Sequence, residues 1–123
     1  MNLYPSIPHE LGLKSIDYWI SEFPDELNAK FNKNFVMKAI DFILNNNIFI
    51  FNDVYYKQIK GTAIGPSFAP TYANLTVGFL EIKLYNIIEC NFSINMKDFI
   101  MKLWKRYIDD CFIIWSHTLD LLI

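Results

Sequence analysis

Cysteine is scarce in this sequence, which has only two, Cys90 and Cys111. Two cysteines do not make the disulfide framework of a small secreted domain, and neither has further metal-ligating residues at a useful spacing. We therefore expect both thiols to be reduced and buried, in an intracellular protein.

An excess of positive charge, a long apolar run and a leader are also lacking. The net charge is −2, so the chain has no overall basic footprint for nucleic acid. Charged or amide residues interrupt every apolar stretch before it reaches the roughly 20 residues that a membrane span requires, so we expect no membrane partner. The first residues have neither the basic region nor the apolar stretch of a signal peptide.

Apolar and aromatic side chains, by contrast, are abundant. Hydrophobic residues make up 53% of the 123 positions and aromatic residues 17%, in a chain long enough for one domain with a core. We expect some of this apolar surface to pack against neighbouring segments outside the sequence. The alternative is a complete domain that is unusually apolar.

Hydrophobic periodicity and turn residues together predict an α+β fold, a small antiparallel sheet backed by helices. Apolar residues recur at steps of three and four over 35–44, which indicates an amphipathic helix. In chain order, the expected elements are the end of a strand at residues 1–4, a helix from Pro8, a short helix at 25–31, a helix capped by Asn34 and ended by Asn45 to Asn47, a hairpin of 48–51 and 54–56, a helix capped by Ser67 and running to about Ile88, and a hairpin of 103–108 and 111–115.

Two adjacent carboxylates, Asp109 and Asp110, stand between the apolar runs of the last hairpin. Like charges side by side repel each other, and Asp-Gly or Asn-Gly is more usual at a hairpin turn. A divalent cation removes this conflict, because Mg²⁺ or Mn²⁺ takes carboxylate oxygens readily, and phosphoryl transfer through two metals requires such a cluster. The pair is therefore a candidate catalytic and metal site. The alternative is a solvated acidic turn.

A loop of small residues, Gly61-Thr62-Ala63-Ile64-Gly65-Pro66-Ser67, precedes the longest predicted helix. Its glycines allow another backbone or a base to approach closely, and helix N-termini favour anionic groups. It is not a phosphate-binding P-loop, because no Gly-Lys-Ser/Thr follows. The alternative is a loop with ordinary helix-start residues.

Three segments, taken together and in order, resemble the reverse transcriptase family. Tyr107-Ile108-Asp109-Asp110 is similar to its Tyr-x-Asp-Asp hairpin, and Leu3-Tyr4-Pro5-Ser6-Ile7-Pro8 to the end of its first palm motif. Residues 61–74, Gly-Thr-Ala-Ile-Gly-Pro-Ser-Phe-Ala-Pro-Thr-Tyr-Ala-Asn, look like the motif that supports the templating base and the incoming nucleotide. With Lys105, Arg106 and Trp115, the residue choice most resembles reverse transcriptases of Penelope-like retroelements, a class of retrotransposon.

The resemblance implies a polymerase palm fragment with RNA-directed DNA polymerase (nucleotidyltransferase) activity. Its partners would be an RNA template, a DNA primer and deoxynucleoside triphosphates. Asp109 and Asp110 would be catalytic and would hold Mg²⁺ or Mn²⁺, with Asp109 the more direct ligand. Tyr4 would screen the 2′-position of the incoming sugar. The other implied site residues are Ile64 and Gly65 for the nucleotide pocket, and Gly61, Phe68, Asn74 and Tyr107 for support of template and primer.

The segments that surround the family's palm lie outside this sequence. Counting back from Tyr4, the family's first metal-binding aspartate would stand two positions before Met1, and the fingers and thumb segments would be needed as further partners. We therefore expect residues 1–123 to be a partial reverse transcriptase domain that is inactive by itself. Two alternatives stay open: an inert retroelement remnant, which stop codons close upstream would favour, and a non-catalytic palm-like interaction module, which would be stable and monodisperse.

Overall fold

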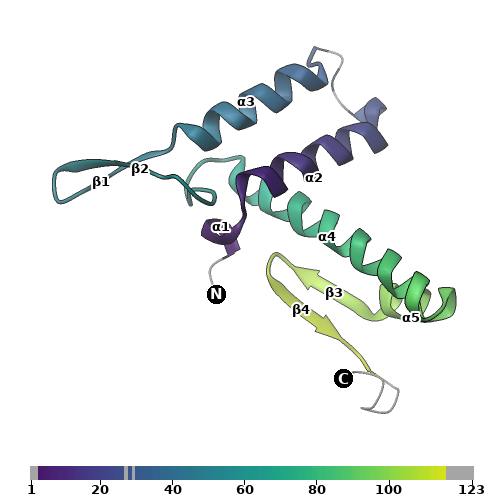
Figure 1. Ribbon diagram of the computed structural model, residues 1–123. Coiled ribbons are helices and arrows are strands. Elements are labelled where there is room, and N and C mark those ends of the chain that lie inside the picture. Colours follow the sequence, from purple (N-terminus) through teal and green to yellow (C-terminus); the bar gives the residue numbers. More distant parts are fainter. Residues whose placement is uncertain (1–2, 27, 29, 116–123) are drawn as a thin grey trace. The chain divides into compact units, whose positions relative to one another are not determined.

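The chain folds into helices and short strands, which a computed structural model describes for residues 3–26, 28 and 30–115 (Figure 1). It divides into two compact units, Met1–Phe79 and Leu80–Ile123. The described residues form five α-helices, one short 3₁₀-helix and two antiparallel sheets of two strands each. The predicted α+β class is confirmed, but the described strands make two separate hairpins in place of one sheet.

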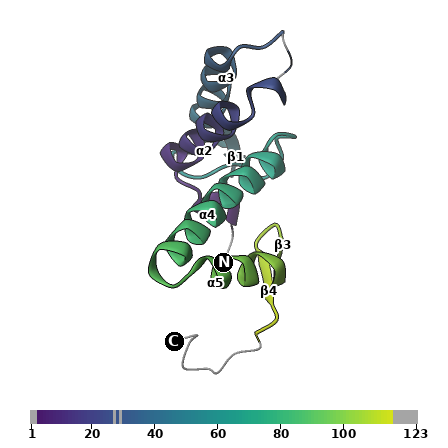
Figure 2. The ribbon, with the colours of Figure 1, turned by 90° about the vertical axis from the view of Figure 1, so that its right-hand side faces the viewer.

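The first unit consists of helices followed by a hairpin. Helices α2 and α3 lie side by side in both views (Figures 1 and 2). The elements are α1 (Leu3–Ser6), α2 (His9–Glu22), the 3₁₀-helix η1 (Pro24–Glu26), α3 (Lys33–Asn45), β1 (Ile48–Phe51), β2 (Val54–Lys57) and the first turns of α4 (Ala69–Asn91).

The segment Leu3–Ser6 is a helical turn, so the strand end expected there is wrong over these residues. Residues 1 and 2 of the expected strand lie outside the described part of the chain. The backbone hydrogen bonds of Tyr4 explain why this segment is a helical turn and not a strand. The carbonyl of Tyr4 accepts one from the N–H of Ile7 at 3.4 Å, which closes the turn, and one from the N–H of Thr62 at 2.8 Å.

Three helix starts and ends differ from the sequence prediction. Asn32, rather than Asn34, caps α3, because its extended backbone lets its Oδ1 accept from the N–H of Phe35 at 2.7 Å. The short helix expected over 25–31 is described only as η1, and its residues 27 and 29 lie outside the described part. Helix α4 begins at Ala69 with Phe68 in the cap position, since the Phe68 carbonyl accepts from the N–H of Tyr72, so Ser67 precedes the cap.

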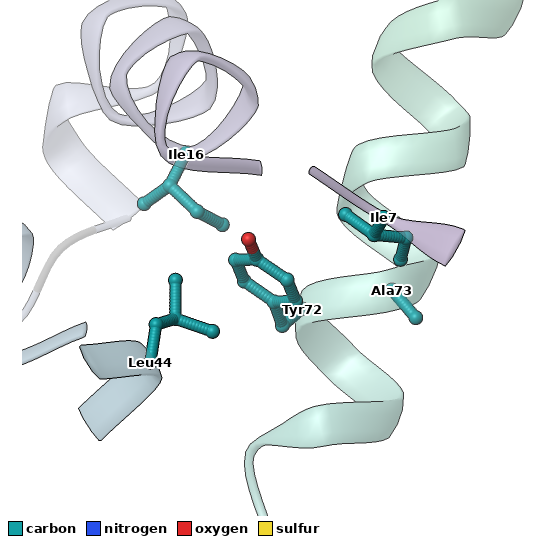
Figure 3. Close-up of a cluster of buried hydrophobic side chains, with 5 residues drawn as sticks. All are labelled: Ile7, Ile16, Leu44, Tyr72 and Ala73. Carbon is teal, nitrogen blue, oxygen red and sulfur yellow. The ribbon is translucent and has the colours of Figure 1, made fainter. Parts of the chain in front are cut away.

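The core of the first unit forms around the ring of Tyr72, which lies among the other buried side chains of its cluster (Figure 3). Gly12 of α2 faces this ring, and a Cβ at that position would lie 1.7 Å from the Tyr72 Oη. A glycine is therefore required for α2 to approach α4 so closely. The cluster consists of Ile7, Ile16, Leu44, Tyr72 and Ala73.

The hairpin of β1 and β2 is apolar on both faces and exposed throughout. It projects beyond the end of α3 (Figure 1). Its two turn residues, Asn52 and Asp53, have φ of 51° and 58°, which is the geometry of a type I′ turn and suits these residue types. Phe51 is 66% exposed on one face and Tyr55 74% exposed on the other. A surface of this kind favours self-association.

The second unit contains the rest of α4, then α5 (Ile94–Leu103), β3 (Trp104–Tyr107) and β4 (Asp110–Ile113). Helix α5 was missed from the sequence, although two signals for it are present. Ser93 caps it by accepting from the N–H of Met96 at 3.1 Å, and Met96, Phe99 and Ile100 repeat at helical spacing. Both cysteines are free, as expected, but Cys90 and Cys111 are exposed, so the prediction of buried thiols is wrong.

We expect the β1–β2 hairpin to drive self-association of the chain. Glutamate at Phe51 and Tyr55 places one charge on each apolar face, so the double variant should sediment as a monomer at concentrations where the original chain associates. Thermal unfolding should change little, because both side chains are mostly exposed. The matched control adds the same two charges at the exposed Asn34 and Asn95. Equal association of the two double variants would show that another surface is responsible.

Candidate functional site

The turn between β3 and β4 carries the two aspartates. Tyr107 pairs with Asp110 across the hairpin, which leaves a loop of two residues, Ile108 and Asp109. Ile108 has a φ of 55°, and a positive φ at the first loop position belongs to the type II′ turn, where glycine is usual. A β-branched residue in this conformation is strained by about 1–3 kcal/mol and needs support from its surroundings.

Both carboxylates of the turn face solvent. Asp109 and Asp110 are exposed, and neither forms an ion pair with another described residue. Tyr107, opposite Asp110, is 78% exposed. A shallow depression of about 250 Å³ adjoins the turn, lined by Lys105, Arg106, Tyr107, Asp110, Cys111 and Phe112. The hairpin therefore presents an acidic tip beside a basic and aromatic surface.

The other side of the hairpin is fixed to helix α4 through Glu81. Arg106 donates from Nε to Glu81 Oε1 at 2.8 Å and from Nη2 to Oε2 at 3.0 Å, and Trp104 donates from Nε1 to Oε1 at 2.7 Å. The Arg106 and Glu81 side chains are only 12% and 17% exposed. Burial acts to raise the pKa of Glu81, but the hydrogen bonds from Arg106 and Trp104 and the charge of Arg106 outweigh it, so the pKa lies below its ordinary value.

The same guanidinium also reaches the turn. Its Nη1 donates to the carbonyl oxygen of Ile108 at 3.0 Å, so Arg106 joins the carboxylate of Glu81 to the strained peptide. No role for Glu81 was predicted from the sequence. Its only signal is an acidic residue in the helix that precedes the basic and aromatic residues of β3, and the pairing depends on a contact across 25 positions.

The donor set at the turn fits a hard divalent cation. Carboxylate oxygens are the ligands that Mg²⁺ prefers, and water completes its coordination shell. Among the residues that the structure describes, no group of three or more His, Cys, Asp or Glu gathers to hold a metal. Asp109 and Asp110 together would therefore hold one such ion with few protein ligands, and hold it weakly.

In the first unit, the Tyr4 segment and the glycine-containing loop, which lie more than 50 positions apart in the sequence, are in contact. The N–H of Thr62 donates to the carbonyl of Tyr4 at 2.8 Å, and Nε2 of His9 lies 2.8 Å from the carbonyl oxygen of Gly61. Gly61 has a φ of 74°, and a Cβ there would lie 2.2 Å from the carbonyl oxygen of Pro5. The Tyr4 segment and the glycine-containing loop are thus held together by hydrogen bonds, and the close approach of their backbones requires glycine at position 61.

The remaining candidate residues differ in exposure. Ile64 is 69% exposed, and Gly65 beside it is exposed with a φ of 141°. Phe68 packs against the buried cluster, with its ring edge-on to that of Tyr72, and Asn74 lies on an exposed part of α4. All of these, with Tyr4 and Gly61, belong to the first unit, whereas Tyr107, Asp109 and Asp110 belong to the second.

Comparison of the chain with protein-family models, with curated proteins and with solved structures finds no match in any of the three. A search of the described helices for one long and apolar enough to cross a membrane also finds none. The function of this chain must therefore be inferred from its own residues and their geometry.

The depressed pKa of Glu81 makes the stability of the chain depend on pH. Because folding lowers this pKa, ionised Glu81 contributes stability above its ordinary value of 4.5, and the contribution is lost as the pH falls through the lower folded value. The free energy of unfolding of the original chain should therefore exceed that of Glu81→Gln at neutral pH, and the difference should shrink at acid pH. Urea unfolding at a series of pH values, followed by fluorescence, measures it.

The matched control for this experiment is Glu89→Gln. Glu89 lies in the same helix and pairs with Lys97 at 2.6 Å, but its side chain is 40% exposed, so solvent weakens the pair. We expect a smaller loss at neutral pH in this variant. Indistinguishable pH profiles for Glu81→Gln and Glu89→Gln would contradict the special role of the partly buried Glu81–Arg106 pair.

Proposed function

We propose that the chain is a palm segment of an RNA-directed DNA polymerase, a reverse transcriptase of the Penelope-like retroelement type. One observation carries the proposal most directly: an exposed pair of aspartates, Asp109 and Asp110, at the tip of a two-residue hairpin turn whose first residue is strained. Strained backbone next to acidic groups without an ion-pair partner is typical of functional sites. Such strain persists only where contacts of the surrounding structure offset its free-energy cost. A plain solvated turn has no need of it.

The chemistry that suits this pair is phosphoryl transfer. Bound Mg²⁺ would activate the attacking 3′-hydroxyl of the primer and stabilise charge on the phosphate oxygens. Asp109 and Asp110 would hold the cation at the tip of the hairpin, with Asp109 the more direct ligand. Lys105 and Tyr107, on the face of the hairpin that carries Asp110, would contact the backbone and a base of the primer.

The contact between the Tyr4 segment and the Gly61 loop supports the nucleotide side of the proposal. Tyr4 is half-buried, its side chain packs against the buried cluster, and its carbonyl accepts from the N–H of Thr62, so its backbone lies beside the loop. Ile64 and Gly65 remain exposed on that loop, where a base or sugar could approach. In this role Tyr4 would crowd a ribose 2′-OH, and the exposed loop residues would line the nucleotide pocket.

Cation binding by the aspartate pair can be measured on the 123-residue chain. Terbium is a hard oxygen-seeking cation, and Tyr107, opposite Asp110, is placed to sensitise its luminescence. We expect Asp109→Asn to weaken terbium binding about tenfold, or about 1.4 kcal/mol, and Asp110→Asn to weaken it less. Mg²⁺ should compete for the site. The matched control is Asp53→Asn at the tip of the other hairpin. Equal binding by the original chain and by Asp109→Asn/Asp110→Asn would show that the pair is only a solvated acidic turn.

Polymerase activity is the second test, in a chain that carries residues 1–123 together with the residues encoded on either side. We expect magnesium-dependent DNA synthesis on an RNA template. Asp109→Asn should lower it by about a thousandfold or more, because losing a metal ligand costs several kcal/mol and each 1.36 kcal/mol is about tenfold in rate. Asp53→Asn should retain full activity. Synthesis that is undiminished in Asp109→Asn would refute the proposal.

A further inference from the structure

We propose that Glu81 and Arg106 form a clamp that holds the Tyr107–Asp110 turn in its strained conformation and so positions the aspartate pair for a cation. Both are positioning residues, since they act through the turn. The second half of this inference, cation binding, rests on the proposed function. The first half, control of the turn conformation, stands on the contacts alone.

The clamp depends on contacts made by the three nitrogens of the Arg106 guanidinium. Nε and Nη2 of Arg106 engage both carboxylate oxygens of Glu81, while Nη1 engages the carbonyl of Ile108. The guanidinium is planar, so fixing two of its nitrogens fixes the direction of the third. Glu81 lies on a helix of 23 residues, a rigid support. These contacts thereby fix the position of the Ile108 carbonyl relative to the helix.

The strain of Ile108 is the reason why a clamp is needed. A β-branched residue prefers negative φ, so a free Ile108 peptide would relax, and the carboxylates that follow it would change direction. The hydrogen bond from Arg106 favours the strained peptide orientation, because its carbonyl is the acceptor. Trp104 adds a donor to Glu81 from the same strand as Arg106, which limits rotation of the carboxylate.

The first hairpin of the chain offers an internal contrast. Its turn also has positive φ, at Asn52 and Asp53, but these residue types adopt that conformation at low cost. Such a turn keeps its shape without help from a helix. The second hairpin has isoleucine where a permissive residue would serve, and it is the second hairpin that is tied to a partly buried ion pair.

The turn conformation can be read by NMR on the full chain, with Phe51→Glu and Tyr55→Glu in every sample to limit association. A residue with positive φ gives a strong cross-peak between its own amide and Hα protons. We expect this signal at Ile108 in the parent sample and in the control Lys97→Gln, which breaks the ion pair between Lys97 and Glu89. It should be lost in Arg106→Gln and in the double variant Glu81→Gln/Arg106→Gln. An unchanged signal in both variants overturns the clamp.

Terbium affinity then separates geometry from charge. Arg106→Lys keeps the charge but loses the planar fork, and Glu81→Gln/Arg106→Gln removes both charges of the pair. We expect each to weaken binding about tenfold, as is usual when the partners that orient metal ligands are lost. Adding Ile108→Gly to Glu81→Gln/Arg106→Gln should restore most of the affinity, because glycine adopts positive φ freely. A purely electrostatic effect would leave Arg106→Lys at the parent affinity, which overturns the positioning role.

The two failures can be told apart. If the parent binds terbium no better than Asp109→Asn/Asp110→Asn, the proposed metal site is wrong, and the Ile108 cross-peak alone decides whether the clamp exists. If the parent binds terbium well while Arg106→Lys and Glu81→Gln/Arg106→Gln bind equally well, the metal site stands and the clamp has no part in it. A loss of folding stability without a change in cross-peak or affinity also overturns the clamp.

Discussion

The bidentate contact between Arg106 and Glu81 is the interaction on which the second unit depends, because it joins a helix, a strand and a turn through one charged group. Taking two charges out of water is costly, and such a pair often adds little net stability compared with apolar residues of similar size. Its contribution is to fix the orientation of the groups that it joins. A planar guanidinium held at two nitrogens leaves its partner little choice of orientation.

The first unit obtains its order by a different route. Its helices meet around the Tyr72 ring, and the approach of α2 is permitted by the missing side chain at Gly12. The hydroxyls of Tyr72 and Thr62 are buried there without a hydrogen bond of good geometry to another described residue, and burial raises the pKa of Tyr72 to about 12. Buried hydroxyls also pair in this unit, with Ser15 Oγ 3.1 Å from Thr76 Oγ1, whereas the second unit joins a helix to a hairpin through a charged pair.

Most of the elements could be predicted from the sequence, because local pattern determines them. The periodicity of α3 and the Asn52-Asp53 turn of the first hairpin both depend on neighbours in the chain. The position of the aspartate pair at a hairpin turn could also be predicted, from the apolar runs on either side of it. The helical turn at Leu3–Ser6, the partner of Arg106 and the strain at Ile108 could not. Each depends on a contact with a distant segment or on a backbone angle that residue types do not encode.

The contrast between the two turns has a consequence for the order in which the chain folds. A hairpin whose turn residues already favour the turn can nucleate locally, on a timescale of about 1–10 μs. The Asn52-Asp53 hairpin satisfies this condition. The Ile108-Asp109 hairpin does not, since its loop conformation is unfavourable until Arg106 meets a carboxylate 25 positions away. We therefore expect its closure to follow formation of α4, which would make the aspartate turn one of the later parts of the chain to fold.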